Sequence, residues 1–350
     1  MSESPILQLR HCKEGLMDAF MAFASTAFLG TPTWLWLLFI GIVVALLTFD
    51  LGVLHRDHHE IGVKESLLLS AGYISAGLLF GLLVWHWKGA DASLEYYTGF
   101  LIEKSLSMDN VFVMAMIFGY LAIPRKYQHE VLFWGILGVI VLRALMIGLG
   151  AALITQFHWI LYVFGLFLLL TGLRMLFSRV DDEQNMENNK FVRFLRSHLR
   201  VTDQLHDGRF LVRQPNASGK SVIWATPLLL ALILIECADV VFAVDSVPAI
   251  FAITLDPFIV YTSNIFAVLG LRALYFALAA LIHRFAYLKY ALALVLVFIG
   301  AKIFLVNIIG KIPAGISLGV TFGLLLGGVL VSLWKTRNQP VLEDPGKPLH

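Results

Sequence analysis

Three carboxylates lie well inside the apolar stretch from Leu232 to Pro257, which ends in the pair Asp256–Pro257 and is long enough to cross a bilayer: Glu236, Asp239 and Asp245. A carboxylate near the bilayer centre costs roughly 2.5–3.5 kcal/mol on insertion scales, so three of them need compensating positive charge. Ion pairs with basic side chains of neighbouring helices would supply it, and so would a metal cation in a transport path. Three acids in a single span favour the cation site.

The spacing of these acids constrains how they can meet. At about 100° per residue, Glu236 and Asp239 share a helix face, whereas Asp245 lies about 180° from Glu236. A straight helix cannot direct all three at one point, so either two sites exist or the helix is interrupted. Pro248 favours an interruption, because proline has no amide to donate to the carbonyl of Val244. That free carbonyl is a further candidate ligand, as in the discontinuous helices of secondary transporters.

A second set of oxygen donors lies on another predicted span: Glu103, Ser107, Asp109 and Asn110. Glu103 and Asp109 are about 120° away from a common helix face, so this span is also predicted to be kinked or unwound. Together with Ser246, these donors suit a hard divalent cation, which leaves Mn²⁺, Mg²⁺ and Ca²⁺ open. Buried carboxyl groups can release protons when a cation arrives, and proton-for-cation antiport is therefore a natural hypothesis.

Three other charged residues are candidates for charge balance or for the transport path. Arg143 and Arg272 occupy matching positions in two predicted spans. We predict that they pair with surplus acids and hold two halves of the molecule in register; the alternative is a position near a membrane surface. Asp50, near the cytoplasmic end of the first span, is expected to guard the entrance of the path or to donate a ligand; the alternative is an interfacial pair with Arg56.

The elements that must position these residues are membrane helices. Of all residues, 59% are hydrophobic and 14% are charged, whereas a soluble domain carries about 25% charged residues. The apolar residues fall in long runs, which predicts an all-α integral membrane protein. We predict about nine transmembrane helices, at residues 33–54, 67–87, 97–121, 130–153, 158–178, 222–254, 258–282, 287–307 and 314–334.

The predicted transmembrane domain, 33–334, is flanked by two shorter segments and contains one long loop. Residues 1–32 form an N-terminal extracytoplasmic segment with a short interfacial helix, and 335–350 form a disordered tail. The loop 179–221 contains either a basic amphipathic helix on anionic lipid or a solvated linker. Lys and Arg residues concentrate in this loop and in others on the same side, which places the N-terminus outside and the C-terminus in the cytoplasm.

Spans three to five resemble spans six to eight, as two repeats at 97–178 and 222–307. The matched segments are LSMDNVFVM (106–114) with FAVDSVPAI (242–250), and LRAL (142–145) with LRAL (271–274). The first match aligns acids at an offset of 136 residues: Glu103 with Asp239, and Asp109 with Asp245. Further along, an offset of 128 aligns Gly172 with Gly300. Because each repeat has three spans, we predict an inverted-topology 3+3 repeat, with the binding site at its interface near the midplane.

The sequence lacks the motifs of several other function classes. It contains no Walker A loop, no HExxH and no Cys-x-x-Cys-His. We therefore expect neither an enzyme nor an organic cofactor, and no nucleic-acid partner. The expected partners are a divalent metal ion, protons and the lipid bilayer.

Four stretches closely resemble the TerC family of bacterial integral membrane proteins, and the resemblance covers about residues 33–334. They are LIEKSLSMDNVFV (101–113), ECADVVFAVDSVPAIFA (236–252), DPFIVYTSNIFAVLGLRALYF (256–276) and LKYALALVLVFIGAKI (288–303). The resemblance implies a bacterial inner-membrane protein linked to manganese export or to tellurite-resistance operons. It favours Mn²⁺ over Mg²⁺ and Ca²⁺, and it implies that five acids handle the metal: Glu103, Asp109, Glu236, Asp239 and Asp245.

Three functions follow as competing hypotheses. The leading one is a secondary transporter that exports Mn²⁺ in exchange for protons by alternating access. The second is a membrane scaffold or stress-response protein of the tellurite-resistance type, in which the acids bind a structural ion. The third is a passive cation channel, which would use the acids but not the repeat.

Overall fold

The computed structural model of the chain describes residues 26–54, 63–157, 159–177, 195, 201–202, 204–215, 221–278, 287–310 and 312–336. Within them, the backbone alone is described at 50–54, 63, 109, 112, 207, 272, 277–278 and 307–309. The chain divides into two compact units, one of Met1–His58 with Asp256–Phe258 and one of the remaining residues. The predicted interfacial helix, the predicted basic helix of the loop and the tail after residue 336 lie almost wholly outside the described residues.

The first unit consists of a short β-hairpin followed by a helix. Strands β1 (Ala27–Phe28) and β2 (Thr31–Pro32) are antiparallel, and α2 (Thr33–Leu54) follows directly. The turn between the strands places Leu29 and Gly30 at positive φ, 50° and 75°. The indole of Trp36 donates a hydrogen bond of 3.1 Å to the carbonyl of Phe28, which ties the hairpin to the first turns of the helix.

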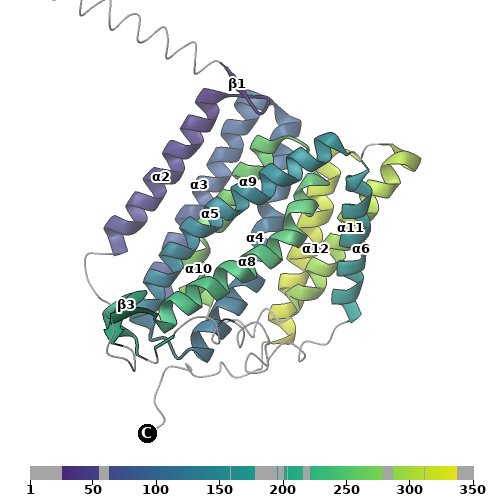
Figure 1. Cartoon of the computed structure of the whole chain (residues 1–350). Coiled ribbons are helices and arrows are strands. Elements are labelled where there is room, and N and C mark those ends of the chain that lie inside the picture. Colours follow the sequence, from purple (N-terminus) through teal and green to yellow (C-terminus); the bar gives the residue numbers. More distant parts are fainter. Residues whose placement is uncertain are drawn as a thin grey trace, which may run out of the picture. The chain divides into compact units, whose positions relative to one another are not determined.

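The second unit is a helical bundle with one β-hairpin (Figure 1). Its helices are α3 (Val63–Lys88), α4 (Ala90–Tyr120), α5 (Arg125–Gln156), α6 (Ile160–Phe177), α8 (Pro227–Phe251), α9 (Pro257–Leu269, of which the first two residues belong to the first unit), α10 (Leu271–Leu278), α11 (Leu288–Ile309) and α12 (Ala314–Lys335). Pairs packed along much of their length include α6 with α11, α5 with α8, and α4 with both α3 and α8.

Glycine and proline set most of the helix ends. Gly89, at φ 92°, separates α3 from α4, and Gly310, at φ 81°, ends α11. Pro124 and Pro313 immediately precede α5 and α12, and Pro227 is the first residue of α8. Proline suits the first helical turn, where its missing amide has no intrahelical partner, and glycine takes the left-handed conformation at low cost.

The burial pattern confirms the predicted all-α membrane class. Among the described residues, seven helices are long and apolar enough to cross a membrane. Their exposed side chains include large apolar ones, such as Leu68, Leu79, Val141, Leu170 and Val241, while polar side chains are buried inside. Such an exterior suits lipid rather than water. The helix α4 carries more charge than that definition allows, and the apolar stretch of α2, Thr33–Phe49, is shorter.

The predicted interruptions of the two acid-bearing spans are wrong. The helix α8 continues through Pro248 to Phe251, and α4 is one helix of 31 residues. Pro248 stands in the last turn of α8, where a proline costs only the amide bond to Val244, and its side chain is buried. The carboxylates of α8 therefore diverge around a regular helix, as the alternative of two separate sites requires.

The discontinuity lies instead in the seventh span, between α9 and α10 at Gly270. A Cβ at Gly270 would lie 2.9 Å from the Cβ of Tyr73 on α3, so glycine permits the close approach of these helices. The ammonium of Lys104 on α4 donates a hydrogen bond of 3.0 Å to the carbonyl of Ala267 in the last turn of α9. A neighbouring helix thus supplies the donor for a carbonyl at the break.

The sixth span begins later than predicted because a β-hairpin precedes it. Strands β3 (Leu211–Pro215) and β4 (Ser221–Ala225) are antiparallel, and α8 starts two residues after β4. The hydroxyl of Thr226 donates to the carbonyl of Arg209 at 2.7 Å, which holds the hairpin against the helix start. The alternation of Val222 and Trp224 with other residues is typical of a strand, but it could not be distinguished from the apolar run that follows directly in the sequence.

Candidate functional site

A buried arginine forms the centre of the candidate site. Arg143 lies in the middle of α5, and its side chain is only 1% exposed. The long side chain carries the guanidinium toward α4 and α8, which pack together beside α5. A buried guanidinium is stable only if acceptors surround it, and four side chains do so here: Glu103, Asp239, Ser246 and Asn264.

The two carboxylates bound by this guanidinium come from different helices. Asp239 on α8 accepts two hydrogen bonds from Arg143, one from Nε at 3.0 Å and one from Nη2 at 2.8 Å. Glu103 on α4 accepts from Nη1 through Oε1. All three side chains are at most 4% exposed, so Arg143 bridges the two carboxylates inside the protein.

Neutral side chains complete the network around Arg143. Nη1 also donates to Oδ1 of Asn264 at 2.7 Å and to the hydroxyl of Ser246 at 3.2 Å. The amide of Asn264 donates to Glu103 at 3.2 Å, and that of Asn110 donates to Asp239, also at 3.2 Å. Each carboxylate therefore has an amide donor besides the arginine. Buried hydrogen-bond networks of this kind favour one arrangement of the helices that supply them.

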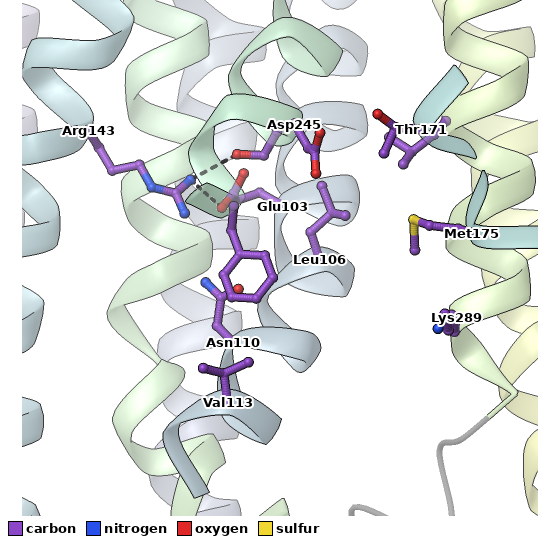
Figure 2. A pocket seen from close by; sticks show the side chains of 12 residues that line it. Glu103, Leu106, Asn110, Val113, Arg143, Thr171, Met175, Asp245 and Lys289 are labelled. Atoms are coloured by element: carbon purple, nitrogen blue, oxygen red, sulfur yellow. Dashed lines mark hydrogen bonds and ion pairs between the residues drawn. The ribbon is translucent and has the colours of Figure 1, made fainter. Parts of the chain in front are cut away.

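Beside the network lies a cavity of about 230 Å³ between two groups of helices. Its wall from α4 and α8 includes Glu103, Asn110, Asp245 and Ser246. The wall from α6 and α11 includes Thr171, Met175, Lys289 and Leu296. Figure 2 shows the carboxylate of Asp245 directed across the cavity toward Thr171, with Lys289 at the opposite end. At about 30 Å³ per water, this space suffices for an ion with several waters.

Glu236 lies apart from that cavity. Its carboxylate faces Gly138 of α5, where a Cβ would come within 2.3 Å of Oε1. Both oxygens are buried, and no hydrogen-bond partner for them exists among the described residues. The first acid of α8 thus contacts the glycine-lined surface of α5, while Asp239 meets Arg143 and Asp245 faces the cavity.

The other residues singled out in the sequence fall into three groups. Ser107 is buried, and its hydroxyl donates to the backbone carbonyl of Glu103 at 2.7 Å. The side chain of Val244 is 45% exposed, so only its backbone could serve a site. For Asp50 on α2, Asp109 on α4 and Arg272 on α10, the backbone alone is described, and the roles predicted for their side chains stay predictions.

Among the residues of the site that were not identified from the sequence are Asn264, Thr171 and Met175. The polar run Thr262–Asn264 inside an apolar span was an available signal for the first, because an amide in a membrane helix needs a partner. No comparable signal marks a single threonine or methionine in an apolar helix. In the described part of the chain, no three His, Cys, Asp or Glu side chains converge as a metal cluster.

Comparison with known proteins gives one family and several close relatives. Residues 88–340 match the family model described as "Integral membrane protein TerC family". "Uncharacterized membrane protein STKORF319" of Myxococcus xanthus is 47% identical over 312 residues, which are 89% of this chain and 95% of that protein. "Putative membrane-bound redox modulator Alx" of Escherichia coli is 47% identical over 314 residues, 87% of this chain and 95% of that protein. No solved structure matches the chain.

Proposed function

The chain belongs to the TerC family of integral membrane proteins. We propose that it is a secondary transporter that exports Mn²⁺ from the cytoplasm. The observation that carries the proposal is the cavity beside the Arg143 network, with carboxylates of two membrane helices, Glu103 and Asp245, in its wall. Ionisable groups inside membrane proteins most often mark a substrate or ion path.

The balance of charge around the cavity supports a divalent substrate. The guanidinium of Arg143 pairs with the carboxylates of Glu103 and Asp239, and the carboxylate of Asp245 lines the adjoining cavity. If all are ionised, two negative charges remain, which one divalent cation would neutralise. Lys289 also lines the cavity but lies at its other end, near the start of α11 (Figure 2). We propose that Asp109 and Glu236 handle the ion further along the path.

Helix packing supports alternating access by an inverted repeat. A Cβ at Gly300 would lie 2.7 Å from the carbonyl oxygen of Gly165, and one at Gly172 would lie 2.7 Å from that of Ala293. The offset of 128 aligns Gly165 with Ala293 and Gly172 with Gly300. Replacing each residue by its partner in the other repeat therefore converts the first contact into the second. A pseudo-two-fold axis between α6 and α11 would require this relationship.

In the proposed cycle, cytoplasmic Mn²⁺ enters the cavity and protons enter from the outside. The N-terminus is outside and the C-terminus in the cytoplasm of a bacterial inner-membrane protein, as the loop charges favour. Carboxylates released by the metal would accept protons for the return step, since an unpaired charge in the membrane interior is costly.

Metal flux in proteoliposomes tests the proposal. We expect saturable Mn²⁺ movement that increases when a pH gradient drives protons in the opposite direction. Asp245→Asn should abolish this flux, because Asp245 faces the cavity, while Asp91→Asn at the exposed start of α4 should leave it unchanged.

A second function has one observation in its favour. The guanidinium of Arg143 pairs with both Glu103 and Asp239, as a purely structural ion-pair network in a membrane scaffold would require. Wild-type protein that inserts into liposomes, retains Mn²⁺ binding and moves no metal would support this scaffold. A flux that rises linearly with Mn²⁺ concentration and does not depend on the pH gradient would instead indicate a channel.

A further inference from the structure

The cavity wall opposite the acids carries two side chains that could bind a metal. Thr171 and Met175 are four residues apart on α6 and therefore share a helix face. Both are partly buried, and both line the cavity. Figure 2 shows the Thr171 hydroxyl facing Asp245 across the cavity, with the Met175 sulfur on the same wall opposite Leu106.

The helix that carries them is tightly joined to α11. At Gly165, Gly172 and Gly300 the backbones of α6 and α11 approach so closely that a Cβ would meet the neighbouring helix at 2.7–3.1 Å. Such close backbone contact is typical of helix pairs that pack through small residues in membranes. The wall from α6 and α11 is thus a stiff unit. The Arg143 network likewise fixes the facing wall from α4 and α8, so the cavity lies between two well-held surfaces.

We infer that Thr171 and Met175 are the ligands that this second wall contributes to a divalent cation held by Asp245, and that the Met175 thioether makes the site select Mn²⁺ over Ca²⁺ and Mg²⁺. The inference rests on the proposed transport function and assigns specificity to the same cavity. It also explains how a site can form where no three acidic, histidine or cysteine side chains converge among the described residues.

The chemistry of the donors supports this assignment. Carboxylate and hydroxyl oxygens bind Mn²⁺, Mg²⁺ and Ca²⁺ alike, so Asp245 and Thr171 alone would not discriminate among them. A thioether is a soft, neutral donor, and Mn²⁺ prefers oxygen ligands as Mg²⁺ and Ca²⁺ do, but as a transition-metal ion it tolerates one sulfur ligand better than the alkaline-earth ions. One sulfur in the coordination sphere therefore penalises Ca²⁺ and Mg²⁺ more than Mn²⁺, without adding charge to the cavity.

The test measures Mn²⁺ and Ca²⁺ affinity by calorimetry on the purified full-length protein in detergent. Met175→Leu conserves volume but removes the thioether. We expect Mn²⁺ affinity to fall about tenfold, equivalent to about 1.4 kcal/mol, with Ca²⁺ affinity unchanged. Met175→Gln supplies a hard oxygen and should raise Ca²⁺ affinity relative to Mn²⁺. Met146→Leu on α5, outside the cavity lining, is the matched control and should behave as wild type.

The outcomes separate this inference from the transport proposal. An unchanged ratio of Mn²⁺ to Ca²⁺ affinity in both Met175 variants, or wild-type protein that binds neither metal, overturns the inference. The wild-type protein could bind Mn²⁺ selectively, lose that selectivity in Met175→Leu, and yet move no metal in proteoliposomes. This result would support the selective site and overturn the transport proposal. Thr171→Val should lower the affinity for both Mn²⁺ and Ca²⁺, since it removes an oxygen donor. If neither affinity changes, Thr171 is not a ligand.

Discussion

Arg143 holds Asp239 by both carboxylate oxygens, with Nε 3.0 Å from Oδ2 and Nη2 2.8 Å from Oδ1. This paired geometry is specific to the planar guanidinium, because a lysine ammonium cannot present two parallel donors. The same guanidinium binds Glu103 on another helix. One side chain therefore fixes the angle and the register of α4 and α8 relative to α5.

Arg143→Gln should destabilise the protein strongly. Removing the arginine leaves two buried carboxylates without their cation, and breaking a buried pair typically costs about 3–5 kcal/mol. Unfolding in detergent, followed by circular dichroism, measures the change. Arg125→Gln at the exposed start of α5 is the control and should lose less than about 1 kcal/mol. A wild-type unfolding midpoint for Arg143→Gln would show that the network contributes little to the fold.

Glu236→Gln and Asp239→Asn should differ sharply although they stand one helical turn apart. The Glu236 oxygens have no hydrogen-bond partner in the described part of the chain, so a neutral amide there should leave stability unchanged or raise it. Asp239→Asn removes the charge that faces Arg143 and should cost about 3–5 kcal/mol. The same unfolding measurement on both variants decides the matter, and equal losses would contradict the separation of the two acids.

Gly300→Ala should loosen the contact between α6 and α11. The added Cβ would lie 2.7 Å from the carbonyl oxygen of Gly165, which is backbone and cannot move aside freely. Overpacking of this kind costs about 1–3 kcal/mol. Gly319→Ala on α12 meets nothing within 4 Å and serves as the matched control. If both variants melt at the same temperature, the close approach of these helices is not required.

Lys104→Met should destabilise the local structure around the helix break at Gly270. It leaves the carbonyl of Ala267 without its donor, and a hydrogen bond from a charged group contributes about 1.5–3 kcal/mol. Hydrogen exchange in α10 should accelerate, while Lys126→Met at the exposed start of α5 should change nothing there. Unaltered exchange in α10 would mean that the lysine does not support the break.

Much of the architecture could be predicted because lipid restricts the choices. Long apolar runs gave the helices, and the cost of buried charge marked Glu103, Asp239 and Arg143 as residues that need partners, which they find in one another. The position of the helix break could not be predicted in the same way. Pro248 is a local signal, whereas Gly270 is required by Tyr73, a residue nearly two hundred positions earlier in the chain.

The neutral side chains of the site escaped prediction for a related reason. Asn264, Thr171 and Met175 acquire meaning only from the side chains that they face across helices. A carboxylate in an apolar run is costly wherever it points, but a methionine there is an ordinary packing residue. The β3–β4 hairpin was missed because β4 directly precedes the apolar helix α8 and shares its apolar composition.

The crossing formed by α9 and α10 has a consequence for how the chain is made. Its mean hydropathy is the lowest of the seven candidate spans, 1.4, and 88% of it is buried against protein. The ring of Phe266 contacts that of Phe80, with centroids 4.7 Å apart, and the carbonyl of Ala267 accepts a hydrogen bond from Lys104; Phe80 and Lys104 are both on helices synthesised earlier. This segment would leave a translocation channel poorly on its own. Stable insertion of α9 and α10 into the bilayer therefore depends on packing against α3 and α4, which are synthesised and inserted before them.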